Sequence, residues 1–173
     1  MRYLMAALAL TLASCGAKTD DHVLTPEGLG AVRIGMTVAQ AEKALGVKFI
    51  ARQEEFFEPG CWYTHPAGEQ VSRAYYMVAG VVIVRIDVRG DAKAPSLHDA
   101  KGLGIGAEEK AVITAYGGHL ENTPHPYLNE TGRYLRIPDK DGKTALLFET
   151  DEGKVTSFRA GRIPFVDYIE GCS

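Results

Sequence analysis

Long apolar runs and clusters of basic residues are both missing from this sequence of 173 residues. The apolar stretch that opens the chain, residues 4–12, has about half of the roughly 20 residues that a membrane-spanning helix needs. The formal net charge is −3, and no run of Lys and Arg could follow a phosphate backbone. The sequence therefore argues against a membrane span at the N-terminus and against a nucleic-acid partner.

Recognisable catalytic motifs are also absent. The sequence contains no Gly-x-Ser-x-Gly nucleophile elbow, no P-loop and no His-Glu-x-x-His pair. Gly102–Gly106 contains three glycines, but the third comes too early for a dinucleotide-binding loop. The histidines have no second His or Cys at the spacing of metal ligands; they are His22, His65, His98, His119 and His125. We therefore expect a protein that is not an enzyme, with no catalytic residue, no cofactor and no metal ion.

Three other sites stay open as alternatives. Cys61 beside His65 could form a thiol–imidazole nucleophile. A metal site could assemble only in the folded chain, from residues far apart in sequence. Asp139–Gly142 begins like a calcium-binding loop but lacks its closing Glu, and a hairpin turn explains it better.

Cysteine is scarce, with residues only at positions 15, 61 and 172. If Cys15 carries a lipid, as argued next, an even pair remains, which suits an oxidising compartment. We predict a disulfide bond between Cys61 and Cys172. It would close a loop of about 110 residues and stabilise the fold by about 4–5 kcal/mol. Two unrelated thiols are the alternative.

The N-terminus has the layout of an export signal. Arg2 precedes the apolar stretch, and small residues follow it. The sequence Leu12-Ala13-Ser14-Cys15 resembles the lipobox of bacterial lipoproteins. The resemblance implies a signal peptide at residues 1–14, cleavage before Cys15, and acyl chains such as palmitate on Cys15, which would hold the protein to a membrane. The alternative is an ordinary secretory signal with a chance cysteine.

The residues after Cys15 indicate to which membrane the protein is sorted. Gly16, rather than Asp, follows the cysteine, which by analogy with the sorting rule of enterobacteria indicates the outer membrane. Residues 15–24 begin with a short polar stretch and are predicted to form the lipidated tether. We therefore expect a lipid-anchored protein of the cell envelope, on the outer membrane and facing the periplasm.

Two stretches about 71 residues apart resemble each other. Residues 30–46 and 101–117 each contain Ile-Gly, about nine residues typical of a helix, and a closing Gly. In the first stretch Thr37 and Gln40 form a capping box, and Gly46 suits a left-handed helix end. The sequence therefore predicts a helix in each stretch.

Strand-like sequence follows each predicted helix. Apolar runs turn at Gly80, at Asp139–Gly142 and at Asp151–Gly153, which indicates antiparallel hairpins. Each unit then consists of a short helix followed by a meander of three or four strands. We expect an α+β fold in which a helix layer packs on antiparallel sheet, with repeats at residues 25–92 and 93–173.

The first helical element resembles that of a known group of envelope proteins. Residues 33–46 contain Gly-Met-Thr, a helical stretch and Leu-Gly, an element similar to one in small outer-membrane assembly lipoproteins of the SmpA/OmlA group. Tandem copies of a similar unit build proteins like the β-lactamase inhibitor protein. The resemblance implies helices packed on antiparallel sheet and a role in binding other proteins. It assigns no binding residue.

Aromatic residues gather in one short segment around Pro59 and Gly60. They are Phe56, Phe57, Trp62 and Tyr63. On a loop anchored by a disulfide, exposed aromatic side chains are typical anchors for protein or glycan recognition. The alternative is that Phe57 and Trp62 fill the core beside the disulfide.

Together these features predict a non-catalytic, membrane-anchored envelope lipoprotein that binds another envelope macromolecule, either an assembly partner or an enzyme that it inhibits. The alternatives are a periplasmic hydrolase whose site is not visible in the sequence, and a protein that binds cell-wall glycan.

Overall fold

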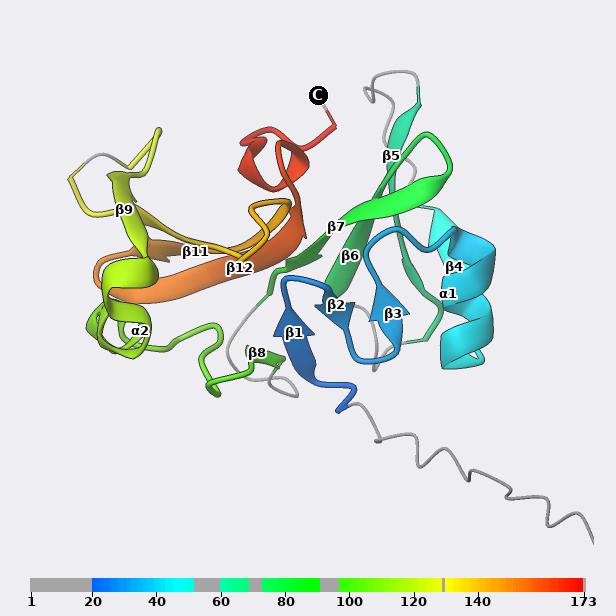
Figure 1. Cartoon of the computed structure of the whole chain (residues 1–173), viewed down its shortest axis with the longest axis horizontal. Helices are drawn as coiled ribbons and strands as arrows, with labels where there is room; N and C mark the ends of the chain where they lie inside the picture. Colours follow the sequence, from blue (N-terminus) through cyan, green and yellow to red (C-terminus); the bar gives the residue numbers. More distant parts are fainter. Residues whose placement is uncertain (1–19, 52–59, 69–72, 91–96, 129, 173) are drawn as a thin grey trace, which may run out of the picture.

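The computed structural model describes residues 20–51, 60–68, 73–90, 97–128 and 130–172 (Figure 1). This part of the chain is mostly antiparallel sheet with two short α-helices, α1 (Val38–Leu45) and α2 (Glu109–Tyr116). The fold is therefore mixed α+β. The predicted signal peptide, Cys15, Phe56 and Phe57 lie outside the described residues.

An eight-stranded sheet forms the centre of the molecule, in the order β4-β5-β6-β7-β12-β11-β10-β9. Its strands are β4 (Phe49–Ala51), β5 (Cys61–Pro66), β6 (Ala74–Ala79), β7 (Val82–Val88), β9 (Glu121–Pro124), β10 (Arg133–Pro138), β11 (Thr144–Asp151) and β12 (Lys154–Arg162). The hairpin turns predicted at Gly80, residues 139–142 and residues 151–153 are confirmed.

The two meanders join where β7 pairs antiparallel with β12. Gly161 lies opposite Arg85 at this junction. A Cβ atom on residue 161 would come within 2.6 Å of the Val84 carbonyl oxygen and 2.8 Å of the Arg85 Cα. Glycine therefore lets the two strands approach each other at the centre of the sheet.

A second, smaller sheet has the order β3-β2-β1-β8. Its strands are β1 (Val23–Thr25), β2 (Gly28–Leu29), β3 (Val32–Arg33) and β8 (His98–Asp99). Val23 and Leu24 were predicted to belong to the tether, but they begin β1, and the Leu24 side chain is fully buried. The folded part therefore begins two residues earlier than predicted, because Leu24 contributes to the core.

The ends of α1 confirm the predicted caps. The Thr37 hydroxyl accepts a hydrogen bond from the Gln40 N–H at 3.2 Å, and the Gln40 side-chain oxygen accepts one from the Thr37 N–H at 2.8 Å. Gly46 ends the helix with φ of 71°. These local bonds satisfy backbone groups that the first and last turns leave unpaired.

The two halves share backbone hydrogen bonds at matching positions. In each half, the turn before the helix is tied to the start of the last strand of the meander. The bonds run from Gly35 N to Ile83 O (2.8 Å) and Ile83 N to Met36 O (2.8 Å), and from Gly106 N to Val155 O (2.8 Å) and Val155 N to Ala107 O (2.9 Å). Register shifts also occur at matching places, at residues 77–78 and 149–150.

One face of the large sheet carries the main apolar core. Residues of both helices and of the small sheet belong to the same cluster, including Ala41, Val112 and Leu24, all fully buried. From the large sheet, Tyr76, Ile86, Phe148 and Phe158 join them. The helices and the small sheet thus bury this face.

The opposite face is covered in part by the C-terminal segment, residues 163–172, which includes the short helix η2 (Phe165–Asp167). The predicted disulfide between Cys61 and Cys172 is present, with the two Cα atoms 5.5 Å apart. Val166 and Cys172 are buried. The end of the chain is thereby fixed to β5 and to the centre of the sheet.

Candidate functional site

Charged side chains lie buried on the face that the C-terminal segment covers. Arg85 is 0% and Asp87 2% exposed, and three hydrogen bonds join them, from Nε to Oδ1 at 3.0 Å and to Oδ2 at 2.9 Å, and from Nη2 to Oδ1 at 2.6 Å. A second buried cation, Arg159, pairs with Glu149 on the neighbouring strand β11. Charges so far from water persist only when they are paired and hydrogen-bonded.

Both arginines also bind the backbone of the C-terminal segment. Arg85 Nη1 donates to the carbonyl oxygens of Phe165 at 3.1 Å and Tyr168 at 2.6 Å. Arg159 Nε donates to the carbonyl oxygen of Val166 at 2.7 Å. With the disulfide, these bonds hold the segment in one conformation on the sheet.

His125, at the end of β9, extends this polar layer. Its Nε2 lies 3.9 Å from Glu149 Oε2, its Nδ1 accepts a hydrogen bond from the Tyr127 N–H at 3.1 Å, and its ring packs edge-on against Tyr134. Burial acts to raise the pKa of Glu149, but the charge and hydrogen bond of Arg159 outweigh it, so this pKa is lowered. The contacts fix the start of the β9–β10 loop on the same face as the C-terminal segment.

Exposed apolar side chains gather where the C-terminal segment meets the β9–β10 loop. Tyr127 is 66% exposed, Leu128 39%, Tyr168 43% and Ile169 41%. The Tyr127 hydroxyl donates a hydrogen bond to Glu170, which joins the two segments. Figure 1 shows both segments on the same side of the large sheet. We call these four residues the aromatic patch.

The aromatic patch stands out from the rest of the described surface. In that part of the chain only two other large apolar side chains are exposed, Ile50 and Val81. Several exposed apolar side chains on neighbouring segments are typical of an interaction surface, whereas single exposed apolar residues are not. Tyrosine is common among interface residues that contribute most of the binding energy.

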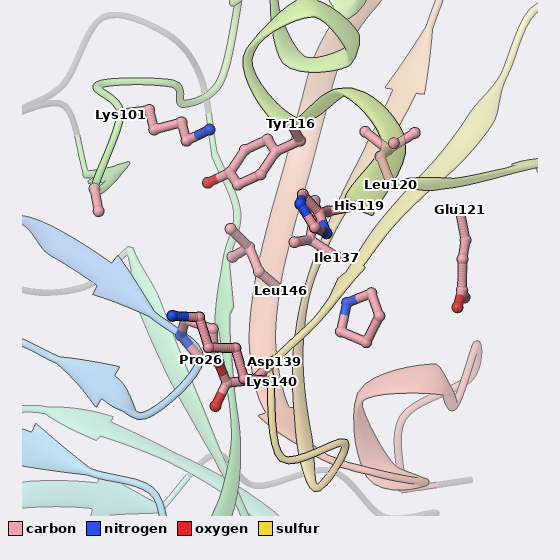
Figure 2. A pocket seen from close by; sticks show the side chains of 13 residues that line it. Pro26, Lys101, Tyr116, His119, Leu120, Glu121, Ile137, Asp139, Lys140 and Leu146 are labelled. Carbon is pink, nitrogen blue, oxygen red and sulfur yellow. The ribbon is translucent and has the colours of Figure 1, made fainter.

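A groove of about 650 Å³ lies at the C-terminal end of α2 (Figure 2). Ile137 and Leu146 from the β10–β11 hairpin form its floor, and Tyr116, Leu120 and Pro26 line its sides. The groove is mostly apolar and of the size that binds small molecules.

Charged groups stand around this groove. Lys101 Nζ lies 4.0 Å from the centre of the Tyr116 ring and donates a hydrogen bond to the Ala115 carbonyl oxygen. The Tyr116 hydroxyl donates to buried Asp99. Burial and this bond raise the pKa of Tyr116 well above its usual value. Lys140 lines the other end. The contacts with Lys101 and Asp99 fix the Tyr116 ring, which lines one side of the groove.

Of the predicted recognition residues, the structure describes Trp62 and Tyr63. Tyr63 is 5% exposed, and burial together with the charge of Asp87 raises the pKa of its hydroxyl to about 12. Trp62 is half-buried and packs against the main core. The core alternative named Phe57 and Trp62, and Trp62 packs as that alternative expects. Phe56 and Phe57 lie outside the described residues, so the recognition role of this segment stays a prediction. The aromatic patch was missed because its residues are about 40 positions apart along the chain.

Among the residues that the structure describes, no group of three or more His, Cys, Asp and Glu side chains could hold a metal ion. No helix in that part of the chain is long and apolar enough to cross a membrane.

No family model matches the chain, and no curated protein matches it. A solved structure that resembles it is an extracellular protein containing a SCP domain from Bacillus anthracis str. Ames, with a TM-score of 0.48 and 10% sequence identity. The match covers 90% of this chain and 50% of that chain, so the present chain spans half the length of that protein. Similarity at this level assigns neither a family nor a function.

Proposed function

We propose that the protein is a membrane-anchored, non-catalytic lipoprotein of the cell envelope that binds another envelope protein through the aromatic patch. The observation that carries the proposal is the gathering of Tyr127, Leu128, Tyr168 and Ile169 on two segments held firmly against one face of the sheet. The partner is an assembly component of the envelope or an enzyme that the protein inhibits.

The way the patch is held supports this function. Tyr168 packs against Phe165 with ring centres 5.4 Å apart, and its own carbonyl oxygen accepts a hydrogen bond from Arg85. His125 and Glu170 hold Tyr127 from two sides. Side chains that are already ordered lose little entropy on binding, which favours affinity.

Asp167 precedes Tyr168 in the chain and places a charged group beside the patch. Asp167 accepts a hydrogen bond from Arg136 Nε at 2.7 Å, and Arg136 also bonds to Glu121 at 3.0 Å. An apolar centre with a polar border is the usual composition of a protein interface. The arrangement therefore suits a protein partner.

The membrane anchor is proposed from the lipobox-like sequence that ends at Cys15. The Cys61–Cys172 disulfide supports an oxidising compartment outside the cytoplasm. Because the folded part begins at Val23, a chain from Cys15 can place it at most about 30 Å from the lipid. The patch would then meet partners close to the membrane surface.

The two halves are proposed to be copies of one unit, each a helix followed by four strands, with the helices as a layer on one face. The matching hydrogen bonds of Gly35 with Ile83 and of Gly106 with Val155 support this origin, as do the matching register shifts. The aromatic patch belongs to the second unit, so the two units need not share one role.

Site-specific photocrosslinking in the native envelope tests the proposed surface. A photoreactive amino acid at position 168 is expected to crosslink one discrete protein, whereas the same group at exposed position 81 is expected to give background only. The same pattern at both positions, or no crosslink at either, would argue against the patch as a binding surface.

The mass of the mature protein tests the proposed lipid anchor separately from the patch. The mass of the purified mature protein should equal that of a chain starting at Cys15 plus its acyl groups, and the Cys15→Ser variant should lack this addition. An unmodified Cys15 would remove the lipoprotein part of the proposal without affecting the patch.

A further inference from the structure

The hydrogen bond between His125 and the backbone of Tyr127 fixes which nitrogen of the His125 ring carries the proton. A backbone N–H can only donate, so Nδ1 of His125, which lies 3.1 Å from the Tyr127 nitrogen, accepts and carries no hydrogen. A neutral imidazole has one donor and one acceptor nitrogen, so the hydrogen lies on Nε2. Nε2 faces Glu149 Oε2 at 3.9 Å. The contacts of the folded chain therefore fit the neutral ring.

Protonation of His125 is incompatible with this hydrogen bond. An imidazolium donates from both nitrogens, so a proton on Nδ1 would point at the Tyr127 N–H, and two donors would face each other. The charged ring is at the same time attracted by Glu149, whose Oε2 lies just beyond hydrogen-bond distance of Nε2. Protonation therefore favours a ring position closer to Glu149 and farther from Tyr127.

Groups on four segments act on the charge of this ring. On β11, Glu149 favours the protonated ring, and on β12, Arg159 opposes it by pairing with Glu149. On β10, the Tyr134 ring packs edge-on with its centre 4.7 Å away, and burial raises the pKa of its hydroxyl, which therefore stays uncharged. The bond to Tyr127 and the burial of His125, which is 7% exposed, favour the neutral ring.

Glu149 remains available as the counter-charge in mild acid. Burial acts to raise its pKa, but the charge and hydrogen bond of Arg159 outweigh burial, and the pKa is lowered from 4.5. Histidine side chains change charge between about pH 5 and 8, where Glu149 is still ionised. A proton taken up by His125 in this range therefore meets a carboxylate on one side and a backbone donor on the other.

The loss of the His125 bond removes one of the two contacts that hold Tyr127. The other is the hydrogen bond from its hydroxyl to Glu170, which lies at the surface, where water competes for both groups. Tyr127 is itself 66% exposed, so little packing replaces the lost bond. The position of Tyr127 in the aromatic patch thus depends on the protonation state of His125.

We propose that His125 is a pH-sensitive switch for the start of the β9–β10 loop, residues 125–128. At neutral pH the uncharged ring holds Tyr127 in the aromatic patch, and in mild acid the protonated ring turns to Glu149 and releases it. That this release also weakens the binding of a partner rests on the proposed function of the patch. The switch itself is a property of the free protein.

Nuclear magnetic resonance spectroscopy of the isotope-labelled protein between about pH 8 and pH 5 tests the switch. At the upper end, the ring nitrogen shifts of His125 should report a proton on Nε2 and an accepting Nδ1. On acidification, the Tyr127 amide resonance should move with the same midpoint as the His125 ring. His119→Asn, at an exposed histidine elsewhere, is the matched control and should leave this titration unchanged.

His125→Asn keeps the hydrogen bond and removes the titrating group. An Asn side-chain oxygen commonly accepts from the N–H two residues ahead, which here is that of Tyr127. The Tyr127 amide of this variant should therefore not follow a histidine titration. The switch is overturned if the His125 ring stays neutral down to about pH 5, if the Tyr127 amide does not follow it, or if His125→Asn titrates like the parent.

Crosslinking from position 168 at about pH 7.5 and about pH 5.5 tests the effect on binding. The parent should give about tenfold less crosslinked product at the lower pH, and His125→Asn should give equal amounts at both. Equal amounts from the parent at both pH values would overturn the regulatory role. No crosslink at either pH would instead count against the proposed function, and the magnetic resonance titration would still decide whether the switch exists.

Discussion

At the scale of single residues, Arg85 and Arg159 explain how the C-terminal segment stays on the sheet. Each is buried, each pairs with a carboxylate, and each donates to backbone carbonyl oxygens of that segment. The residues beside them on the same strands do not distinguish these two arginines from ordinary strand residues in the sequence. The presentation of Tyr168 depends on these two side chains.

Replacing Asp87 with Asn should be strongly destabilising, because it leaves the Arg85 guanidinium buried without a counter-charge. We expect the free energy of unfolding to fall by about 3–5 kcal/mol, measured by denaturant titration. Lys154→Met, which breaks an exposed pair with Glu108, serves as the control and should leave it nearly unchanged. A loss for Asp87→Asn no larger than that of the control would contradict the structural role of the pair.

Glu149 makes a pH-dependent contribution to stability. Its pKa is lowered from 4.5 in the folded protein, so its stabilising effect is complete above the unfolded value and lost as pH falls through the folded one. The difference in unfolding free energy between the parent and Glu149→Gln should therefore be largest above about pH 5 and shrink toward pH 3. A difference that stays constant over this range would show that the charge of Glu149 is not responsible.

The residues of this polar layer could not be recognised from the sequence. Arg85 and Asp87 occupy alternate positions in an apolar strand, a pattern typical of a face exposed to water. They are buried because a segment about 80 positions away covers them. By contrast, the Cys61–Cys172 pairing followed from the small number of cysteines.

At the scale of elements, the features set by neighbouring residues were the predictable ones. The cap of α1 and the hairpin turns of the meanders depend on a few consecutive residues, and all are confirmed. The pairing of β7 with β12 and of β1 with β8 joins distant segments, so no local pattern predicts the register of either pair. For the same reason β1 was not predicted, since Leu24 is buried by distant residues.

Two glycines near the helix ends give a matched pair of variants. Gly46 has φ of 71°, where an alanine is strained, whereas Gly118 is not left-handed, and neither has a heavy atom within 4 Å of an added Cβ. Gly46→Ala should lower the unfolding free energy by about 1–2 kcal/mol, and Gly118→Ala should leave it equal or slightly raise it. Thermal unfolding of both variants measures this, and equal effects would contradict the assigned cap.

At the scale of the whole molecule, the disulfide joins the C-terminus to the first half across a separation of 111 residues. The Cys61→Ser, Cys172→Ser double variant should lose about 4–5 kcal/mol of unfolding free energy, because the unfolded chain regains the freedom of a long loop. Denaturant titration under non-reducing conditions compares it with the parent. A loss below about 1 kcal/mol would mean that the bond contributes little beyond the contacts of Arg85 and Arg159.

The proposed interaction surface also depends on the fold of the whole molecule. The sequence placed the recognition residues at the aromatic segment around Trp62, where the local density of aromatic residues is highest. The folded chain also exposes Tyr127 and Leu128 on one segment and Tyr168 and Ile169 on another, and the hydrogen bond from Tyr127 to Glu170 joins the two segments. No local pattern signals such an arrangement.

The central claim is that this aromatic patch binds a protein of the envelope. Its most direct test is the affinity of the partner identified by crosslinking for three purified forms: the parent, Tyr127→Ser with Tyr168→Ser, and Ile50→Ser with Val81→Ser as the control for exposed apolar residues elsewhere. We predict that the patch variant binds at least about 30-fold more weakly and that the control binds like the parent. Equal affinity of all three forms would contradict the claim.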